Sequence, residues 1–263
     1  MGRITSAVVL RRLVAQVADD LPDRIEVNVP LELGDELARS YTEIRQETLI
    51  EYPSAGALVA TGRLQMFCAH PWLHFTSEST NEDALASNRH YGSLSTPKIQ
   101  RTVSILEEAF VSGKKVLLFT LYNGCIDIFE NATQGLPTAF WGAINGSTPQ
   151  ADRQGIVDAF SEYEGPGCLV LNPKAAGAGL NITAATVVIH FTLAWNPALE
   201  MQASARAHRR GQTAPVHIYR LFYANTVEEV MLDRSERRRA LGESAVPVSR
   251  DSEDLERALS IEP

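Results

Sequence analysis

The stretch QASARAHRRGQ, from Gln202 to Gln212, carries two arginines three residues apart in an otherwise polar segment. On a helix, residues i and i+3 are neighbours, so the guanidinium groups of Arg206 and Arg209 are expected to leave one face side by side. Such a pair suits phosphate oxygens, whose negative charge must be stabilised during phosphoryl transfer. For an isolated R-x-x-R, the simpler interpretation is a surface helix with salt bridges to carboxylates such as Glu200.

A second segment, LVLNPKAAGAGLNITAATVVIHF, lies about thirty residues upstream, from Leu169 to Phe191. Its pattern predicts a strand, a glycine-bearing loop and a second strand, and Trp195-Asn196-Pro197 follows shortly after. The small residues of the loop allow backbone amides to approach a phosphate closely. Taken alone, a G-x-G in a loop indicates little, because turns of all kinds use glycine.

A third segment, AINGSTPQADR, runs from Ala143 to Arg153, where a predicted strand ends and a helix begins. Gly146, Ser147 and Thr148 offer backbone and two hydroxyls at this helix entrance, which is a good setting for a phosphate oxygen. The same residues also suit an ordinary helix cap. Both interpretations stay open at this point.

Together these segments resemble the second RecA-like lobe of the Swi/Snf-type ATPases, the DNA translocases of helicase superfamily two. The family pattern Q, then R-A-H-R-x-G-Q, is matched by Gln202, Arg206, Ala207, His208, Arg209, Gly211 and Gln212. Arg210 departs from it, because the family usually carries an apolar residue there. The resemblance extends from the Leu10-Arg11-Arg12 run to Thr226-Val227-Glu228-Glu229.

The resemblance also implies roles for individual residues. Arg206 and Arg209 would be the catalytic arginine fingers on the γ-phosphate of ATP. The nucleotide side would be supported by Gly177, Gly179, Asn181 and Gln202. Contacts with DNA would come from Asn172, Lys174, Gly146, Ser147, Arg153 and Trp195. Pro173 and Ala176 depart from the family at the DNA side, and core packing is the simpler role for a lone tryptophan.

The alternation of strands and helices in the centre of the chain predicts an α/β fold, a mostly parallel sheet covered on both faces. Strands are expected at residues 116–119, 139–144, 168–171, 187–191 and 216–222. A helix is expected to begin after Thr96-Pro97 and to end before Gly113, and another is expected over residues 150–160. The RecA-like helicase C-terminal lobe is thus predicted over residues 96–225.

Two flanking regions complete this prediction. Residues 1–95 would lead into the lobe and carry a strand at 25–31, a small helical segment that includes a helix at 35–51, and a polar loop at 74–95. Residues 226–263 would form a bracing helix and an acidic, weakly patterned tail. The bracing helix opens with a capping box, Thr226 followed three residues later by Glu229.

Composition limits the classes of function. The net charge of −8 and the pI of about 5.3 show no overall basic excess, so any DNA contact must be local. No apolar run reaches the roughly 18 residues of a membrane span, and no signal peptide is evident, so we expect an intracellular protein, cytoplasmic or associated with the nucleoid or nucleus. Three widely spaced cysteines, Cys68, Cys125 and Cys168, predict buried thiols and no metal site.

The sequence lacks the other half of an ATPase site. An enzyme of this type needs a G-x-x-x-x-G-K-S/T loop for the phosphates and an acidic pair for Mg²⁺, and neither occurs here. The resemblance therefore implies that ATP with Mg²⁺ binds in a cleft completed by a separate or missing first RecA-like lobe, and that the partner nucleic acid is DNA, in duplex form. The rival hypothesis is a non-catalytic module that binds DNA or a helicase and modulates another translocase.

Overall fold

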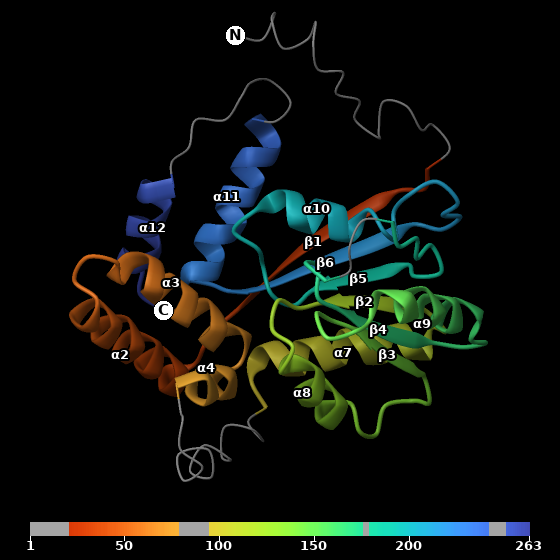
Figure 1. Cartoon of the computed structure of the whole chain (residues 1–263), viewed down its shortest axis with the longest axis horizontal. Coiled ribbons are helices and arrows are strands. Elements are labelled where there is room, and N and C mark those ends of the chain that lie inside the picture. Colours follow the sequence, from red (N-terminus) through yellow and green to blue (C-terminus); the bar gives the residue numbers. More distant parts are fainter. Residues whose placement is uncertain (1–20, 79–94, 176–178, 242–250) are drawn as a thin grey trace, which may run out of the picture.

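The computed structural model describes residues 21–78, 95–175, 179–241 and 251–263. Its centre is a six-stranded sheet with the order β1-β6-β5-β2-β4-β3 (Figure 1). The strands are β1 (Arg24–Leu31), β2 (Lys115–Phe119), β3 (Phe140–Ile144), β4 (Gly167–Leu171), β5 (Val187–His190) and β6 (Val216–Tyr223). All five strand pairings are parallel, as predicted.

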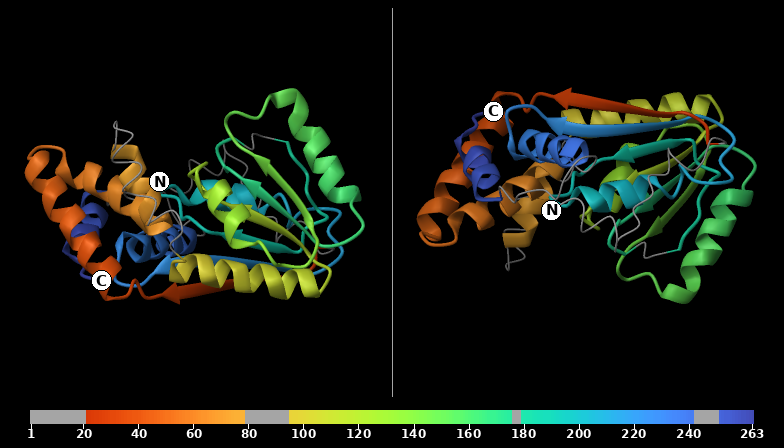
Figure 2. Two further views of the ribbon diagram at one scale, coloured as in Figure 1. Left: turned by 90° about the horizontal axis from the view of Figure 1, so that it is seen from below. Right: turned by 90° about the horizontal axis from the view of Figure 1, so that it is seen from above.

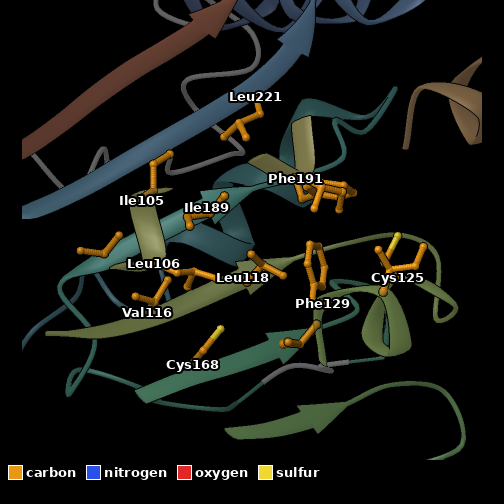
Figure 3. Close-up of a cluster of buried hydrophobic side chains, with 14 of the residues drawn as sticks. Ile105, Leu106, Val116, Leu118, Cys125, Phe129, Cys168, Ile189, Phe191 and Leu221 are labelled. Atoms are coloured by element: carbon orange, nitrogen blue, oxygen red, sulfur yellow. The ribbon is translucent and has the colours of Figure 1, made fainter. Parts of the chain in front are cut away.

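Alternating side chains give the sheet two apolar faces. In β2, Val116 and Leu118 join one buried cluster, which Figure 3 shows, whereas Leu117 and Phe119 join another. The first face is covered by α7 (Pro97–Val111) and α8 (Cys125–Ala132), and the second by α9 (Gln150–Glu162) and α10 (Pro197–Ser204). The predicted cover of helices on both faces is therefore confirmed, and Figure 2 shows it from two further sides.

A group of helices packs beyond the carboxyl ends of β1 and β6 (Figures 1 and 2). It consists of α2 (Asp35–Glu51), α3 (Gly56–Ala69), α4 (Pro71–Glu78), α11 (Val227–Leu241) and α12 (Asp251–Ser260). These helices share a third apolar cluster, centred on residues such as Leu64, Phe67 and Val230. The small helical segment predicted before the lobe is thus present, and it packs against the end of the chain.

The strand predicted at residues 25–31 lies in the same sheet as the lobe. β1 pairs with β6 over eight residues, from Arg24 opposite Val216 to Leu31 opposite Tyr223. The sequence showed a strand here but not its partner, because pairing between residues almost two hundred positions apart leaves no local signal.

The helix α11 begins directly after Thr226, as predicted. Each side chain of the predicted capping box, however, bonds the backbone N–H one residue earlier than a capping box requires. Thr226 Oγ1 accepts a hydrogen bond from the backbone N–H of Glu228, and the Glu229 carboxylate accepts one from that of Asn225. Val227, Val230 and Met231 are buried, as expected for a brace.

Two flanking predictions need correction. Residues 251–260 were expected to form a weakly patterned tail, but they form α12, whose Ala258 is buried. Its apolar residues Leu255, Ala258 and Leu259 do have helical spacing, which the acidic composition of the segment obscured. In the predicted polar loop, residues 74–78 belong to α4, and residues 79–94 lie outside the described part of the chain.

A buried ion pair joins the sheet to the helical group. The ammonium group of Lys98 in α7 bonds the carboxylate of Glu228 in α11, and both side chains are fully buried. The Lys98 backbone N–H also donates to the Tyr223 hydroxyl (3.3 Å), and Glu228 accepts the backbone N–H of Tyr223 (3.0 Å). One polar cluster thus fixes α7, β6 and α11 against each other.

Candidate nucleotide and DNA site

The predicted arginine pair does not lie on a helix. The helix α10 opens with Asn196, whose side chain accepts a hydrogen bond from the backbone N–H of Ala198 (3.1 Å), and runs back over the sheet towards the amino ends of the strands (Figure 1). It ends at Ser204, so Arg206 and Arg209 belong to residues 205–212, which we call the arginine turn.

The backbone of the arginine turn departs from a helix at two points. The carbonyl of Arg206 accepts a hydrogen bond from the backbone N–H of Ile182 (3.0 Å), a partner outside the helix. Further along, Gly211 has φ of 99°, in the region that favours glycine, and the N–H of Gln212 bonds the carbonyl of Arg209 (3.0 Å). The expectation that the two arginines share one helical face is therefore wrong.

The two arginines have different surroundings. Arg206 is only 8% exposed, and burial lowers the pKa of its guanidinium group. Arg209 is exposed to solvent. The arginine turn thus holds one guanidinium in the protein and presents the other at the surface.

The side of α10 that faces the sheet makes polar contacts with it. His190, at the end of β5, has Nε2 2.8 Å from the Ser204 hydroxyl and stacks on Phe119. Burial, together with the nearby positive charge of Arg220, lowers the His190 pKa to about 3, so the ring is neutral near neutral pH. Glu200 accepts the N–H of Ala194 (2.8 Å) and lies 3.4 Å from Arg220. None of these sheet contacts was foreseen from the sequence, although a histidine within an apolar strand is the signal that pointed to one of them.

The arginine turn also contacts the chain just before β1. His208 Nε2 lies 2.8 Å from the carbonyl oxygen of Pro22. A carbonyl can only accept, so this nitrogen carries the proton. In this chain, His208 therefore makes a structural contact between the arginine turn and the segment before β1.

The residues predicted for the nucleotide side lie partly beside the arginine turn. Gly179, with φ of 116°, and Asn181 are exposed and lead directly to Ile182, which bonds the turn. Gln202 is exposed in the last turn of α10. Gly177 lies outside the described residues.

The predicted DNA contacts follow the carboxyl ends of three strands. After β3, Asn145 Oδ1 accepts hydrogen bonds from the backbone N–H (2.9 Å) and the hydroxyl (2.6 Å) of Ser147. Residues 145–148 form what we call the Asn145 turn, in which Gly146 and Ser147 are exposed. The hydroxyls bond Asn145 and not the first turn of α9, whose N-cap is Pro149.

Arg153 closes the Asn145 turn. Its Nε and Nη2 donate to the carbonyl of Thr148 (3.0 and 2.9 Å), and its Nη1 donates to the carbonyl of Ala175. The guanidinium group therefore joins the turn after β3 to the loop after β4. The family resemblance implied a DNA contact for Arg153, but all three of its guanidinium nitrogens bond backbone carbonyls.

The loop after β4 is fixed by Asn172, whose side chain donates to the carbonyl of Leu121 (3.1 Å) and accepts the N–H of Lys174 (3.0 Å). Lys174 itself is exposed. After β5, Trp195 is half-buried against the helical group, with the Arg234 guanidinium 5.5 Å from its ring centre. Packing thus accounts for much of the Trp195 surface.

Other features of the described residues bear on the sequence predictions. Cys68, Cys125 and Cys168 are buried free thiols, as predicted. Within the described ranges, no helix is both long and apolar enough to cross a membrane. In the same part of the chain, no three histidine, cysteine or acidic side chains gather as a metal site.

Comparison with known proteins places this geometry in a family. Residues 97–211 match the family described as "Helicase conserved C-terminal domain". The chain is 31% identical over 231 residues to a Mycoplasma pneumoniae "Uncharacterized ATP-dependent helicase", covering 86% of this chain and 21% of that protein. It is 29% identical over 238 residues to the Mus musculus "SWI/SNF-related matrix-associated actin-dependent regulator of chromatin subfamily A member 1", covering 86% of this chain and 22% of that protein.

A solved structure shows the same likeness. The Sulfolobus solfataricus SWI2/SNF2 ATPase core in complex with dsDNA superposes with a TM-score of 0.68 at 25% identity, over 98% of this chain and 55% of that chain. This chain spans about a fifth of the length of the two curated relatives. It belongs to the Swi/Snf-type helicases and corresponds to their C-terminal RecA-like lobe.

Proposed function

We propose that this lobe supplies Arg206 and Arg209 as arginine fingers to an ATP site whose other half lies on a first RecA-like lobe. The assembled enzyme is a DNA-dependent ATPase that moves along duplex DNA. The observation that carries this proposal is the arginine turn, which places the two arginines of the family pattern in a backbone held by hydrogen bonds to the segment before β5.

The surroundings of the two arginines suit charge stabilisation. During phosphoryl transfer the γ-phosphate oxygens gain negative charge, and a positive group that is already in place stabilises it without reorganisation. Arg206 is largely shielded from water, which strengthens its interaction with an anion. Arg209 is exposed and is the one that a first lobe closing on this surface reaches directly.

The nucleotide would be ATP with Mg²⁺. On this chain, the arginine turn and the exposed backbone around Gly179 suit the phosphates, because both offer positive or hydrogen-bond-donating groups to an anion. The first lobe would supply the phosphate-binding loop and the ligands of Mg²⁺, the ion that neutralises charge on the phosphates when it is bound.

Duplex DNA would contact the carboxyl edge of the sheet. Exposed Gly146, Ser147 and Lys174 offer backbone amides, a hydroxyl and an ammonium group to one phosphate backbone. We assign Asn172 and Arg153 to holding these groups in place, and Trp195 to the rim of the surface. The binding of dsDNA by the Sulfolobus SWI2/SNF2 ATPase core supports this choice of partner.

The test is ATP turnover of the complete enzyme carrying Arg209→Ala. We expect kcat to fall by a factor of about 10³ or more, because transition-state charge loses its partner, while the lobe stays folded. Arg39→Ala removes an exposed arginine on α2 and should leave turnover unchanged. Turnover retained in Arg209→Ala would contradict the finger assignment and favour the non-catalytic module.

A further inference from the structure

One buried carboxamide closes the arginine turn. Gln212 is 6% exposed, and its Nε2 donates to the carbonyls of Thr183 (3.0 Å), Ala185 (3.0 Å) and Ala207 (3.1 Å). Its Oε1 accepts the backbone N–H groups of Thr213 (2.9 Å) and Ala214 (3.2 Å). Five backbone groups thus converge on one side chain.

These contacts fix the orientation of the amide. The nitrogen carries two hydrogens and faces three carbonyls, so at least one hydrogen is shared, and the oxygen faces two N–H groups. Turning the amide over would set its oxygen against three carbonyl oxygens. A carboxylate at this position would meet the same repulsion, since it has no hydrogen to donate.

The carbonyls bound by Gln212 belong to two different segments. Ala207 lies in the arginine turn, one residue after Arg206, whereas Thr183 and Ala185 lie in the segment that leads into β5. The bond from the Ile182 N–H to the Arg206 carbonyl (3.0 Å) joins the same two segments. The backbone of Arg206 is therefore held at two neighbouring points.

The second segment continues the chain from the DNA side of the lobe. It follows β4 and the loop of Asn172 and Lys174, and its described part resumes at Gly179. Its carbonyls at Thr183 and Ala185 are the two that Gln212 holds. Those carbonyls share one amide with the arginine turn.

We propose that Gln212 is a positioning residue that ties the arginine turn to the segment before β5 and so sets the position of Arg206 and Arg209. The inference rests on the proposed function for its effect on turnover. The tie itself is a property of this chain and can be tested without ATP.

The experiment compares Gln212→Glu with the unaltered protein in the complete enzyme, with and without duplex DNA. Misplacing the arginines should lower kcat by a factor of about 10² both with and without DNA, with KM for ATP nearly unchanged. At acidic pH the new carboxyl regains a proton and can donate to one carbonyl, so part of kcat should return. Gln46→Glu makes the same chemical change at an exposed site on α2 and should have no effect.

A second readout uses this chain alone and amide hydrogen exchange. In Gln212→Glu the Ile182 N–H should exchange about tenfold faster or more, because the turn that holds it is loosened. The N–H groups of Thr213 and Ala214 keep an acceptor oxygen and should stay protected.

The outcomes separate this inference from the proposed function. If Arg209→Ala retains turnover, the finger assignment fails, and faster exchange at Ile182 still supports the tie. Unchanged exchange at Ile182 overturns the tie whatever the kinetics. If exchange rises while kcat is unchanged, or only KM changes, the positioning role is overturned.

Discussion

The arginine turn and the Asn145 turn are both closed by side chains that bond backbone carbonyls, but with opposite use of charge. In the arginine turn a neutral amide, Gln212, makes the closing bonds, and Arg209 is left exposed. In the Asn145 turn an arginine, Arg153, makes them, and the exposed groups are backbone and a hydroxyl. An arginine in a sequence motif is therefore not by itself a phosphate ligand, since the carbonyls around it decide its role.

Both turns belong to one lobe that we expect to unfold cooperatively, and the buried Lys98–Glu228 pair offers a test of this. Lys98→Met leaves the Glu228 carboxylate buried without its cation, so the free energy of unfolding should fall by about 3–5 kcal/mol in urea denaturation. Arg101→Met removes a half-exposed ion pair on the same helix and should cost less than about 1 kcal/mol. Equal losses in the two variants would contradict the role of the buried pair.

The contact between His190 in the sheet and Ser204, just before the arginine turn, should affect the pH dependence of stability. Folding lowers the pKa of His190 from 6.5 to about 3, so between these values the unfolded chain binds a proton that the folded chain does not. Stability should be fully present above pH 6.5 and fall as the pH drops towards 3, with a slope of up to about 1.4 kcal/mol per pH unit from this residue. His190→Gln should flatten this slope, and an unchanged slope would show that other groups cause it.

The Asn145 turn can be loosened without touching the arginine turn. Arg153→Lys keeps the charge but cannot bond both carbonyls as the guanidinium does, so we expect a loss of about 1–2 kcal/mol in the free energy of unfolding and weaker DNA binding. Basal ATP turnover of the complete enzyme should be unchanged. Undiminished DNA binding in this variant would show that the order of the turn is not needed.

The smallest effect is expected at Lys174, where only an exposed charge is removed. Lys174→Ala should weaken DNA binding about equally for all sequences and reduce the slope of log K against log salt by about 1, with basal ATPase intact. Lys114→Ala removes an exposed lysine near the amino edge of the sheet and should leave the slope unchanged. A change in sequence preference would contradict a purely phosphate contact.

Elements with a repeating pattern were predictable from the sequence. The helix α7 begins where Thr96-Pro97 predicts, with Thr96 Oγ1 accepting the N–H of Ile99 (3.3 Å), and the five central strands follow their apolar runs. These signals are local, since capping and side-chain alternation depend on near neighbours.

Features that depend on distant parts of the chain were not predictable. The turn that follows α10 after Ser204 could not be foreseen, because the Arg206 carbonyl bonds an N–H that is 24 positions earlier in the chain. The hydrogen bond from Arg153 to the Ala175 carbonyl also joins two loops that are distant in the sequence, so it could not be predicted either. The motif indicates where the proposed site lies, and the packing of the loops decides which arginines are exposed there.

We expect Arg206 and Arg209 to contact the transferring phosphate when ATP is hydrolysed. The most direct measurement is a structure of the complete enzyme with ADP, aluminium fluoride and Mg²⁺, which imitate the transferring phosphate. We expect guanidinium nitrogens of both arginines at hydrogen-bond distance, about 3 Å, from the fluoride ligands. A closed enzyme in which both guanidinium groups stay remote from the aluminium fluoride would contradict it.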